Sequence, residues 1–269
     1  MSPSPAAPRS ALLAAWASAW LAGEASLPEL VDRVSARDDV HSVTGLARDT
    51  LPLEQAMARL RADGVTRLRV VLPEPGDPVG LPGPGAFSTA ALDAAEGVLA
   101  LQPHGAGTGT GAGTGLVPTV TSHGSVFDGT VTTVLWTAYA VTVPGPDPGP
   151  FLHEAEHDLR LGVVDAARAL GELDVARWRP ELSEQLQGLR SAARRGIDTD
   201  ELPGSYPPRA RQLLVQARQL VGVLQLAAVD DGAAVDAREA DARTSALREL
   251  GRAVRRAHIA AYNAHGLPS

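Results

Sequence analysis

The chain has 269 residues, a mass of 27.9 kDa and a formal charge of −7, which is long enough for one large domain or two small ones. With 44% apolar and 20% charged residues, its composition is that of a soluble globular protein and excludes wholesale disorder. The chain has no cysteine and all 24 basic residues are arginine, which excludes disulfides, thiolate nucleophiles, P-loop lysines and Schiff-base lysines.

The amino-terminal third predicts three short helices, at residues 10–22, 27–36 and 52–63. The apolar run in the first helix imitates a short secretory signal, but its small residues lie inside the run rather than after it. We therefore expect a packed helix with Ser10 as its N-cap and with Leu13, Trp16 and Trp20 at helical spacing. This interpretation predicts a cytoplasmic protein, and no stretch has the length and apolar character of a membrane helix.

The strand signals come next. Residues 65–72 alternate, which predicts a half-buried strand with Arg67 and Arg69 on its solvated side. A loop rich in proline and glycine follows, and then a helix at 88–96 and a strand at 97–101. The alternating glycines of residues 105–115 predict a flexible loop. The remaining strands are expected at residues 115–121 and 130–143, and because the later connections are short, the sheet should be mostly antiparallel.

Prolines at positions 144, 146, 148 and 150 end the strand region, and helical patterns follow. The four helices are predicted at residues 151–176, 180–195, 208–229 and 234–263. In the last of them Leu247, Leu250 and Val254 belong to an apolar seam that we expect to be buried. The arginines of the other side, at positions 248, 252 and 255, are expected to face water. The predicted fold class is α+β, with a small mostly antiparallel sheet and short helices in residues 1–150 and a helical bundle in residues 151–269. The two regions form separate domains or share one core.

The composition points to a source. The chain has 46 alanines, two isoleucines and no lysine, a bias typical of GC-rich genomes. The phrases Leu173–Glu181 (LDVARWRPE) and Ala260–Ala264 (AAYNA) resemble those of uncharacterised proteins of high-GC actinobacteria. The resemblance implies a source and no activity.

The segment His153-Glu154-Ala155-Glu156-His157 matches the zincin pattern H-E-x-x-H, in which two histidines on one helical face bind zinc and the glutamate activates a water. Zincins keep the inner positions of this motif uncharged because their helix is buried, whereas here Glu156 places a charge at one of them. The sequence downstream also supplies no third zinc ligand at the usual spacing. Acidic residues in a first helical turn suit the helix dipole. We therefore expect no metal, and a zinc-dependent hydrolase using His153, Glu154 and His157 is the alternative function.

The loop from Pro73 to Gly85 is the preferred candidate for a ligand or partner surface, because long specific loops inside compact domains often bind. Glu74 and Asp77 are its candidate contacts. The negative charge and the few aromatic residues argue against nucleic acid. We therefore expect a protein without catalytic apparatus or cofactor that binds a protein partner or a small molecule, with a homo-oligomer as a further possibility.

Overall fold

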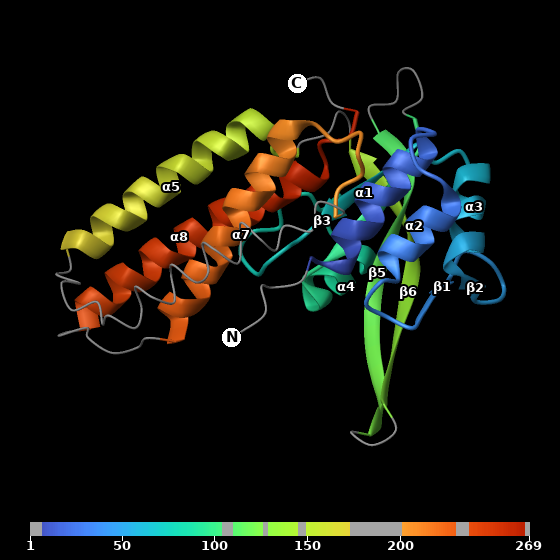
Figure 1. The fold of residues 1–269 in the computed structure, drawn as a ribbon, viewed down its shortest axis with the longest axis horizontal. Helices are drawn as coiled ribbons and strands as arrows, with labels where there is room; N and C mark the ends of the chain where they lie inside the picture. Colours follow the sequence, from blue (N-terminus) through green and yellow to red (C-terminus); the bar gives the residue numbers. More distant parts are fainter. Residues whose placement is uncertain are drawn as a thin grey trace. The chain divides into compact units, whose positions relative to one another are not determined.

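The computed structural model describes residues 7–103, 110–125, 129–144, 149–172, 201–229 and 237–266. They form a mixed α/β protein with a six-stranded, mostly antiparallel sheet and, among the described residues, seven helices (Figure 1). The chain divides into two compact units. The sheet unit comprises residues 7–149, 200–206 and 265–269, and the helical unit comprises residues 1–6, 150–199 and 207–264. The helix predicted at 180–195 lies outside the described residues.

The sheet unit holds all six strands and four helices. The strands are β1 (Val40–Thr44), β2 (Leu51–Pro52), β3 (Arg67–Val71), β4 (Gly97–Leu101), β5 (Thr110–Ser125) and β6 (Gly129–Pro144), in the order β2-β1-β6-β5-β4-β3. The helices are α1 (Arg9–Leu21), α2 (Leu27–Val34), α3 (Leu53–Ala62) and α4 (Ala86–Ala94). Neighbouring strands are antiparallel except β1 and β6, which are parallel, so the prediction of a mostly antiparallel sheet is confirmed.

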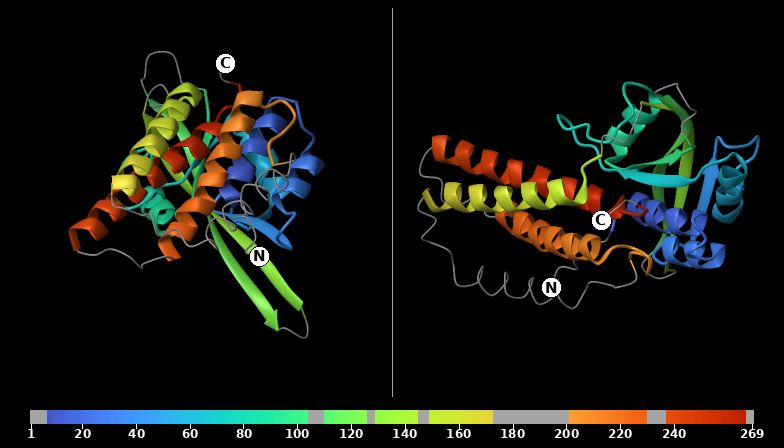
Figure 2. Two further views of the ribbon diagram at one scale, coloured as in Figure 1. Left: turned by 60° about the vertical axis from the view of Figure 1, so that its left-hand side comes forward. Right: turned by 90° about the horizontal axis from the view of Figure 1, so that it is seen from above.

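Helices cover the two faces of this sheet unequally. α1, α2 and α3 lie on one face, and α4 lies on the other face against β5 (Figures 1 and 2). The alanine-rich α1 is buried along almost its whole length, because its small side chains let it approach β3 and β4 closely. Leu13 and Trp16 pack as the spacing predicted, whereas Ser10 is not the N-cap. Pro8 takes that position, and the backbone N–H and hydroxyl of Ser10 donate to the Glu96 carboxylate at 2.9 and 2.7 Å.

Two expectations about the strands are wrong. β3 is not half-buried: Arg69 is only 2% exposed, because the loop after β3 folds back over it and the carbonyl of Gly80 accepts a hydrogen bond from the guanidinium at 3.0 Å. The glycine-rich segment is not all loop either, since β5 begins at Thr110. A Cβ on Gly115 would lie 2.2 Å from the Phe87 ring of α4, so the missing side chain is what lets α4 pack on the sheet.

The helical unit contains α5 (Leu152–Glu172), α7 (Pro208–Val229) and α8 (Ala237–Tyr262). A shared apolar cluster joins the three helices, and it includes Leu159, Leu213, Leu250 and Val254. The buried seam of α8 is confirmed at Leu250 and Val254, but Leu247 is only half-buried and Arg255 is buried rather than exposed. Within the part of the chain that the structure describes, no helix is long and apolar enough to span a membrane.

Candidate functional site

The two histidines of the zincin-like segment lie at the start of α5, where both side chains are exposed. The Glu154 carboxylate accepts a hydrogen bond from the backbone N–H of Phe151 at 3.4 Å, and Glu156 forms an ion pair with Arg209 of α7 at 2.6 Å. That ion pair lowers the pKa of Glu156. Among the described residues, no group of three His, Asp or Glu side chains is placed to hold a metal ion. The segment begins a helix and links α5 to α7.

The loop of residues 73–85 places its two acidic side chains differently. The backbones of Glu74 and Asp77 bond to each other, so the loop turns sharply between them. Asp77 is buried and Glu74 is exposed. Gly80, with φ +87°, lies against Val71, so this end of the loop is packed onto β3. Glu74 is therefore the candidate contact of the pair that solvent can reach.

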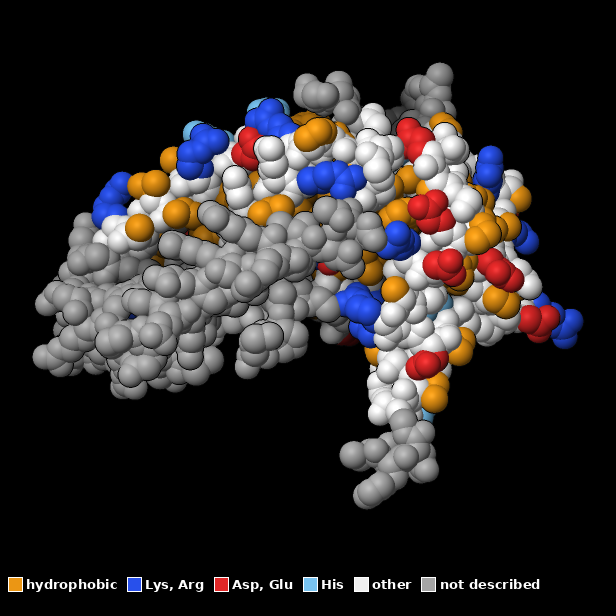
Figure 3. Space-filling view, viewed as in Figure 1, with side chains coloured by type: hydrophobic (Ala, Val, Ile, Leu, Met, Phe, Trp, Pro, Cys, Tyr) orange, Lys and Arg blue, Asp and Glu red, His pale blue; other side chains and the backbone are white. Residues whose placement is uncertain are grey.

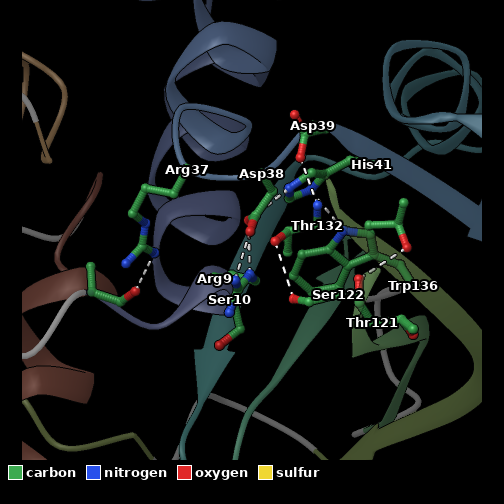
Figure 4. Close-up of polar contacts among 12 residues, drawn as sticks. Arg9, Ser10, Arg37, Asp38, Asp39, His41, Thr121, Ser122, Thr132 and Trp136 are labelled. Atoms are coloured by element: carbon green, nitrogen blue, oxygen red, sulfur yellow. Dashed lines mark hydrogen bonds and ion pairs between the residues drawn. The ribbon is translucent and has the colours of Figure 1, made fainter. Parts of the chain in front are cut away.

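Sequence reasoning missed a buried polar cluster that joins α1, β1 and β6 (Figure 4). Arg9 donates twice to Asp38, from Nε at 2.8 Å and from Nη2 at 2.6 Å. Nε2 of His41 lies 3.1 Å from the same carboxylate, and Nε1–H of Trp136 donates to Nδ1 of His41 at 3.2 Å. Because Nδ1 accepts, the proton of a neutral His41 must lie on Nε2, where it is donated to Asp38.

This cluster has the residue types of a catalytic dyad but not its accessibility. The side chains of Asp38 and His41 are each only 1% exposed, and both ring nitrogens of His41 are engaged. Burial raises the pKa of Asp38, but the hydrogen bonds from Arg9 and His41 outweigh it, so the pKa lies below its ordinary value. Burial also lowers the pKa of His41. The cluster therefore fixes β1 against β6 and leaves no ring nitrogen for a substrate.

The part of the sheet where β1 pairs with β6 has, among the described residues, no helix packed on the α4 side. β1 pairs with β6 from Thr133 to Thr137, beyond the region that α4 covers on that face. Side chains alternate between the faces of a strand, so one set on β1, β5 and β6 points to the open side. We call this set the open face: Val40, Ser42, Thr44, Thr119, Thr121, His123, Val131, Thr133, Leu135 and Thr137.

Three aliphatic side chains of the open face are exposed to an unusual degree. Val40 and Val131 are each 50% exposed and Leu135 is 39% exposed. The other members of the open face are hydroxyl side chains and His123, so it carries no carboxylate or guanidinium. On the opposite face of the sheet unit, by contrast, charged side chains gather over the helices (Figure 3). The open face therefore combines three exposed aliphatic side chains with uncharged polar ones.

β5 and β6 also continue past the strands beside them. β4 pairs with β5 only as far as Leu116, yet β5 continues to Ser125 in unbroken register with β6. We call residues 119–125 and 129–132 the extension, which reaches beyond the helices of the sheet unit (Figure 1). In the extension Ser122 and Thr132 share a side-chain hydrogen bond of 3.2 Å, and both faces are exposed from Thr119 to Gly124.

The helical unit has a cleft of about 720 Å³ between α5 and α8. Small residues such as Gly162 and Ala253 line it together with the charged side chains of Asp158, Glu249 and Arg252. Glu249 and Arg252 pair with each other at 2.6 Å. Deeper in this unit, burial and the charge of Arg218 lower the pKa of His258 to about 4. The cleft is therefore lined largely by small residues, and two of its charged side chains, Glu249 and Arg252, neutralise each other.

Comparisons with known proteins match almost the whole chain. The family model described as "Rv1486c-like protein, N-terminal domain" matches residues 10–150, and the model described as "Rv1486c-like protein, C-terminal domain" matches residues 153–259. No solved structure matches the chain.

Several curated relatives are mycobacterial. "Uncharacterized protein Rv1486c" of Mycobacterium tuberculosis (strain H37Rv) is 30% identical over 294 residues, which cover 94% of this chain and 95% of the relative. "Uncharacterized protein ML1804" of Mycobacterium leprae is 29% identical with the same coverage. "Uncharacterized protein MAV321" of Mycobacterium avium is 32% identical over 77% of this chain and 68% of its own length. These relatives confirm the resemblance to actinobacterial proteins, and their names indicate no activity.

Proposed function

The chain belongs to the Rv1486c-like family, and we propose that it acts without catalysis by binding a protein partner on the open face of its sheet unit. One observation carries this proposal. Among the described residues of the sheet unit, the exposed large aliphatic side chains are Val40, Val120, Val131 and Leu135. Three of these four, Val40, Val131 and Leu135, lie on the open face, whereas Val120 points to the opposite face of the sheet. Side chains scattered at random would also appear on the helices. Their concentration on one part of the sheet favours a surface that a partner covers.

The chemistry of the open face defines the partner that it fits. Three exposed aliphatics supply apolar area, and the threonine and serine hydroxyls offer both donors and acceptors. The absence of carboxylates and guanidinium groups from this face means that a charged partner surface would lose hydration without gaining ion pairs. The proposed partner therefore presents a flat surface of aliphatic and hydroxyl side chains.

The proposal can be tested by photo-cross-linking in actinobacterial cells. A photoreactive amino acid at Val131 should form an adduct with a partner, whereas the same amino acid at Glu54, an exposed position on α3, should not. The adduct should disappear when Leu135→Asp places a charge on the open face. Equal adduct yields from the two positions, or an adduct insensitive to Leu135→Asp, would contradict the proposal.

The zinc-hydrolase alternative gains no support from the relatives' names or from the geometry around His153, Glu154 and His157. Glu74 and Asp77 stay a predicted second contact, with Glu74 as the reachable member of the pair. Because α1 is a buried part of the sheet unit, we propose that this segment is retained and that the protein is cytoplasmic.

The division of the chain into residues 1–150 and 151–269 likewise stays a proposal, as does the helical bundle. The exposed side chains of Leu161, Val163 and Val164 on α5 support a bundle, because a further helix could cover them. Residues 180–195 are the predicted source of that helix.

A further inference from the structure

We propose that the outer edge of β5 pairs with the same edge of a second copy of this chain, forming a two-fold dimer with a continuous sheet. The proposal concerns the backbone edge of the extension, whereas the proposed function concerns side chains on the open face. The two can therefore fail separately.

The register shows which backbone groups point outward from this edge. The N–H of Thr132 donates to the Asp39 carboxylate at 2.6 Å, and the carbonyl of Thr132 accepts from the Asp39 N–H at 2.8 Å. Both groups of Thr132 thus point away from β5. In an antiparallel pair, the residue opposite such a position also points away from its partner strand, and that residue is Ser122. Because the pattern alternates, Val120 and Gly124 point outward with it.

Natural sheet edges are usually protected by charges, bulges or prolines. Each β5 residue from Thr110 to Ser125 faces a single β6 residue, so the edge has no bulge. Residues 119–125 include no acidic or arginine side chain. Pro118, which lacks an N–H, lies at one end of this stretch, and Gly124, with φ +138°, lies at the other. The unprotected stretch is therefore short and has defined limits.

The geometry of this edge favours a second copy as the occupant. An antiparallel pair of identical strands is self-complementary, so one two-fold axis satisfies both edges at once. An axis at Ser122 pairs Ser122 with itself and Val120 with Gly124 of the copy, and it keeps Pro118 out of the ladder. The chain as a whole carries a charge of −7, but the neutral extension brings no like charges together at this contact.

The absence of cysteine makes a direct test simple, because one introduced thiol is the only one present. Ser122→Cys in the full-length chain should form a disulfide-linked dimer under mild oxidation, since directly opposed strand residues have Cα atoms about 5.5 Å apart. Thr130→Cys is the matched control, because Thr130 is an exposed residue of the extension on the other strand. Sedimentation equilibrium of the unmodified chain should give twice the mass of 27.9 kDa.

Two further variants are designed to disturb pairing at the outer edge of β5 without disturbing the fold of the chain. Val120→Pro removes an outward N–H and leaves the β5–β6 hydrogen bonds in place, and Ser122→Lys opposes two like charges at the axis. Each should weaken dimerisation roughly tenfold or more while the circular dichroism spectrum and thermal transition stay unchanged. A monomeric wild-type chain at about 100 µM, or a dimer that persists in both variants and is not cross-linked by Ser122→Cys, would overturn the proposal.

Discussion

The same two strands, β5 and β6, pass through two different surroundings. Between Gly113 and Pro118, β5 is covered by α1 on one face and by α4 on the other, and Gly115 leaves room for the Phe87 ring. From Thr119 onward, no helix lies over β5 and no strand lies beyond it among the described residues, and both faces are exposed as far as Gly124. The register with β6 is continuous across the boundary.

The side chains change at the same boundary. The covered part is filled by apolar groups and closed by polar groups that bond to one another, as in the cluster of Arg9, Asp38, His41 and Trp136. The extension keeps the valine and threonine pattern of a strand, but its side chains from Thr119 to Gly124 do not pack into a core. The comparison teaches that the covered part holds the fold together, whereas the extension leaves its two faces exposed to solvent.

The largest contrast is expected at two adjacent residues of β6. Trp136 is fully buried on the helix-covered face, and Leu135 lies on the open face. Trp136→Ala should cost about 3–5 kcal/mol of unfolding free energy, because it leaves a large cavity and removes the donor to His41. Leu135→Ala should cost about 1 kcal/mol or less. Urea melts of both variants measure the difference, and similar losses would remove the distinction between the helix-covered face and the open face.

A smaller loss of unfolding free energy is expected when Asp38 is replaced, whose carboxylate bonds to Arg9 of α1 and to His41 of β1. Asp38→Ala should cost about 2–3 kcal/mol at pH 7, because it leaves a buried histidine and a partly buried arginine without their carboxylate. The pKa of Asp38 is lowered in the folded protein, so its stabilising contribution is present above pH 3.8 and is lost as the pH falls below that value. Asp32→Ala, at an exposed acidic residue of α2, is the control and should change little.

The tight packing of α4 on β5 gives a third test. Gly115→Ala should cost about 1–3 kcal/mol, because the new Cβ would overlap the Phe87 ring. Gly204→Ala is the control, since no atom lies within 4 Å of a Cβ built there. Thermal melts of the two variants measure the loss of stability at each site, and only Gly115→Ala should lower the melting temperature. A Gly115→Ala variant as stable as the wild type would show that α4 can shift without loss of stability and that the covered part is loosely packed at this contact.

Much of the fold could be predicted from local sequence signals. Pro208 and the glycines and prolines that flank the other helices mark helix ends directly, and the predicted helix at 208–229 coincides with α7. β1 was missed because its five residues alternate only weakly, and their burial depends on β6, some ninety positions later. Arg69 was misassigned because alternation shows two sides of a strand but not what covers each side.

The candidate site was harder to predict than the fold. No local signal distinguishes Val131 from a core valine, since both occur in a run of valine and threonine. Its exposure follows from where β1 and β4 stop pairing, which is a property of the assembled sheet. The Asp38-x-x-His41 spacing is visible in the sequence, but its meaning depends on Arg9 and Trp136, which are distant in the chain.

The most direct test of the central claim is to measure stability and partner binding in one variant, Leu135→Asp. We predict that its unfolding free energy stays within about 1 kcal/mol of the wild-type value, because Leu135 is on the open face. We also predict that photo-cross-linking from Val131 falls to the level of the Glu54 control. A loss of several kcal/mol with the adduct retained would contradict the account and make the open face part of the fold rather than a binding surface.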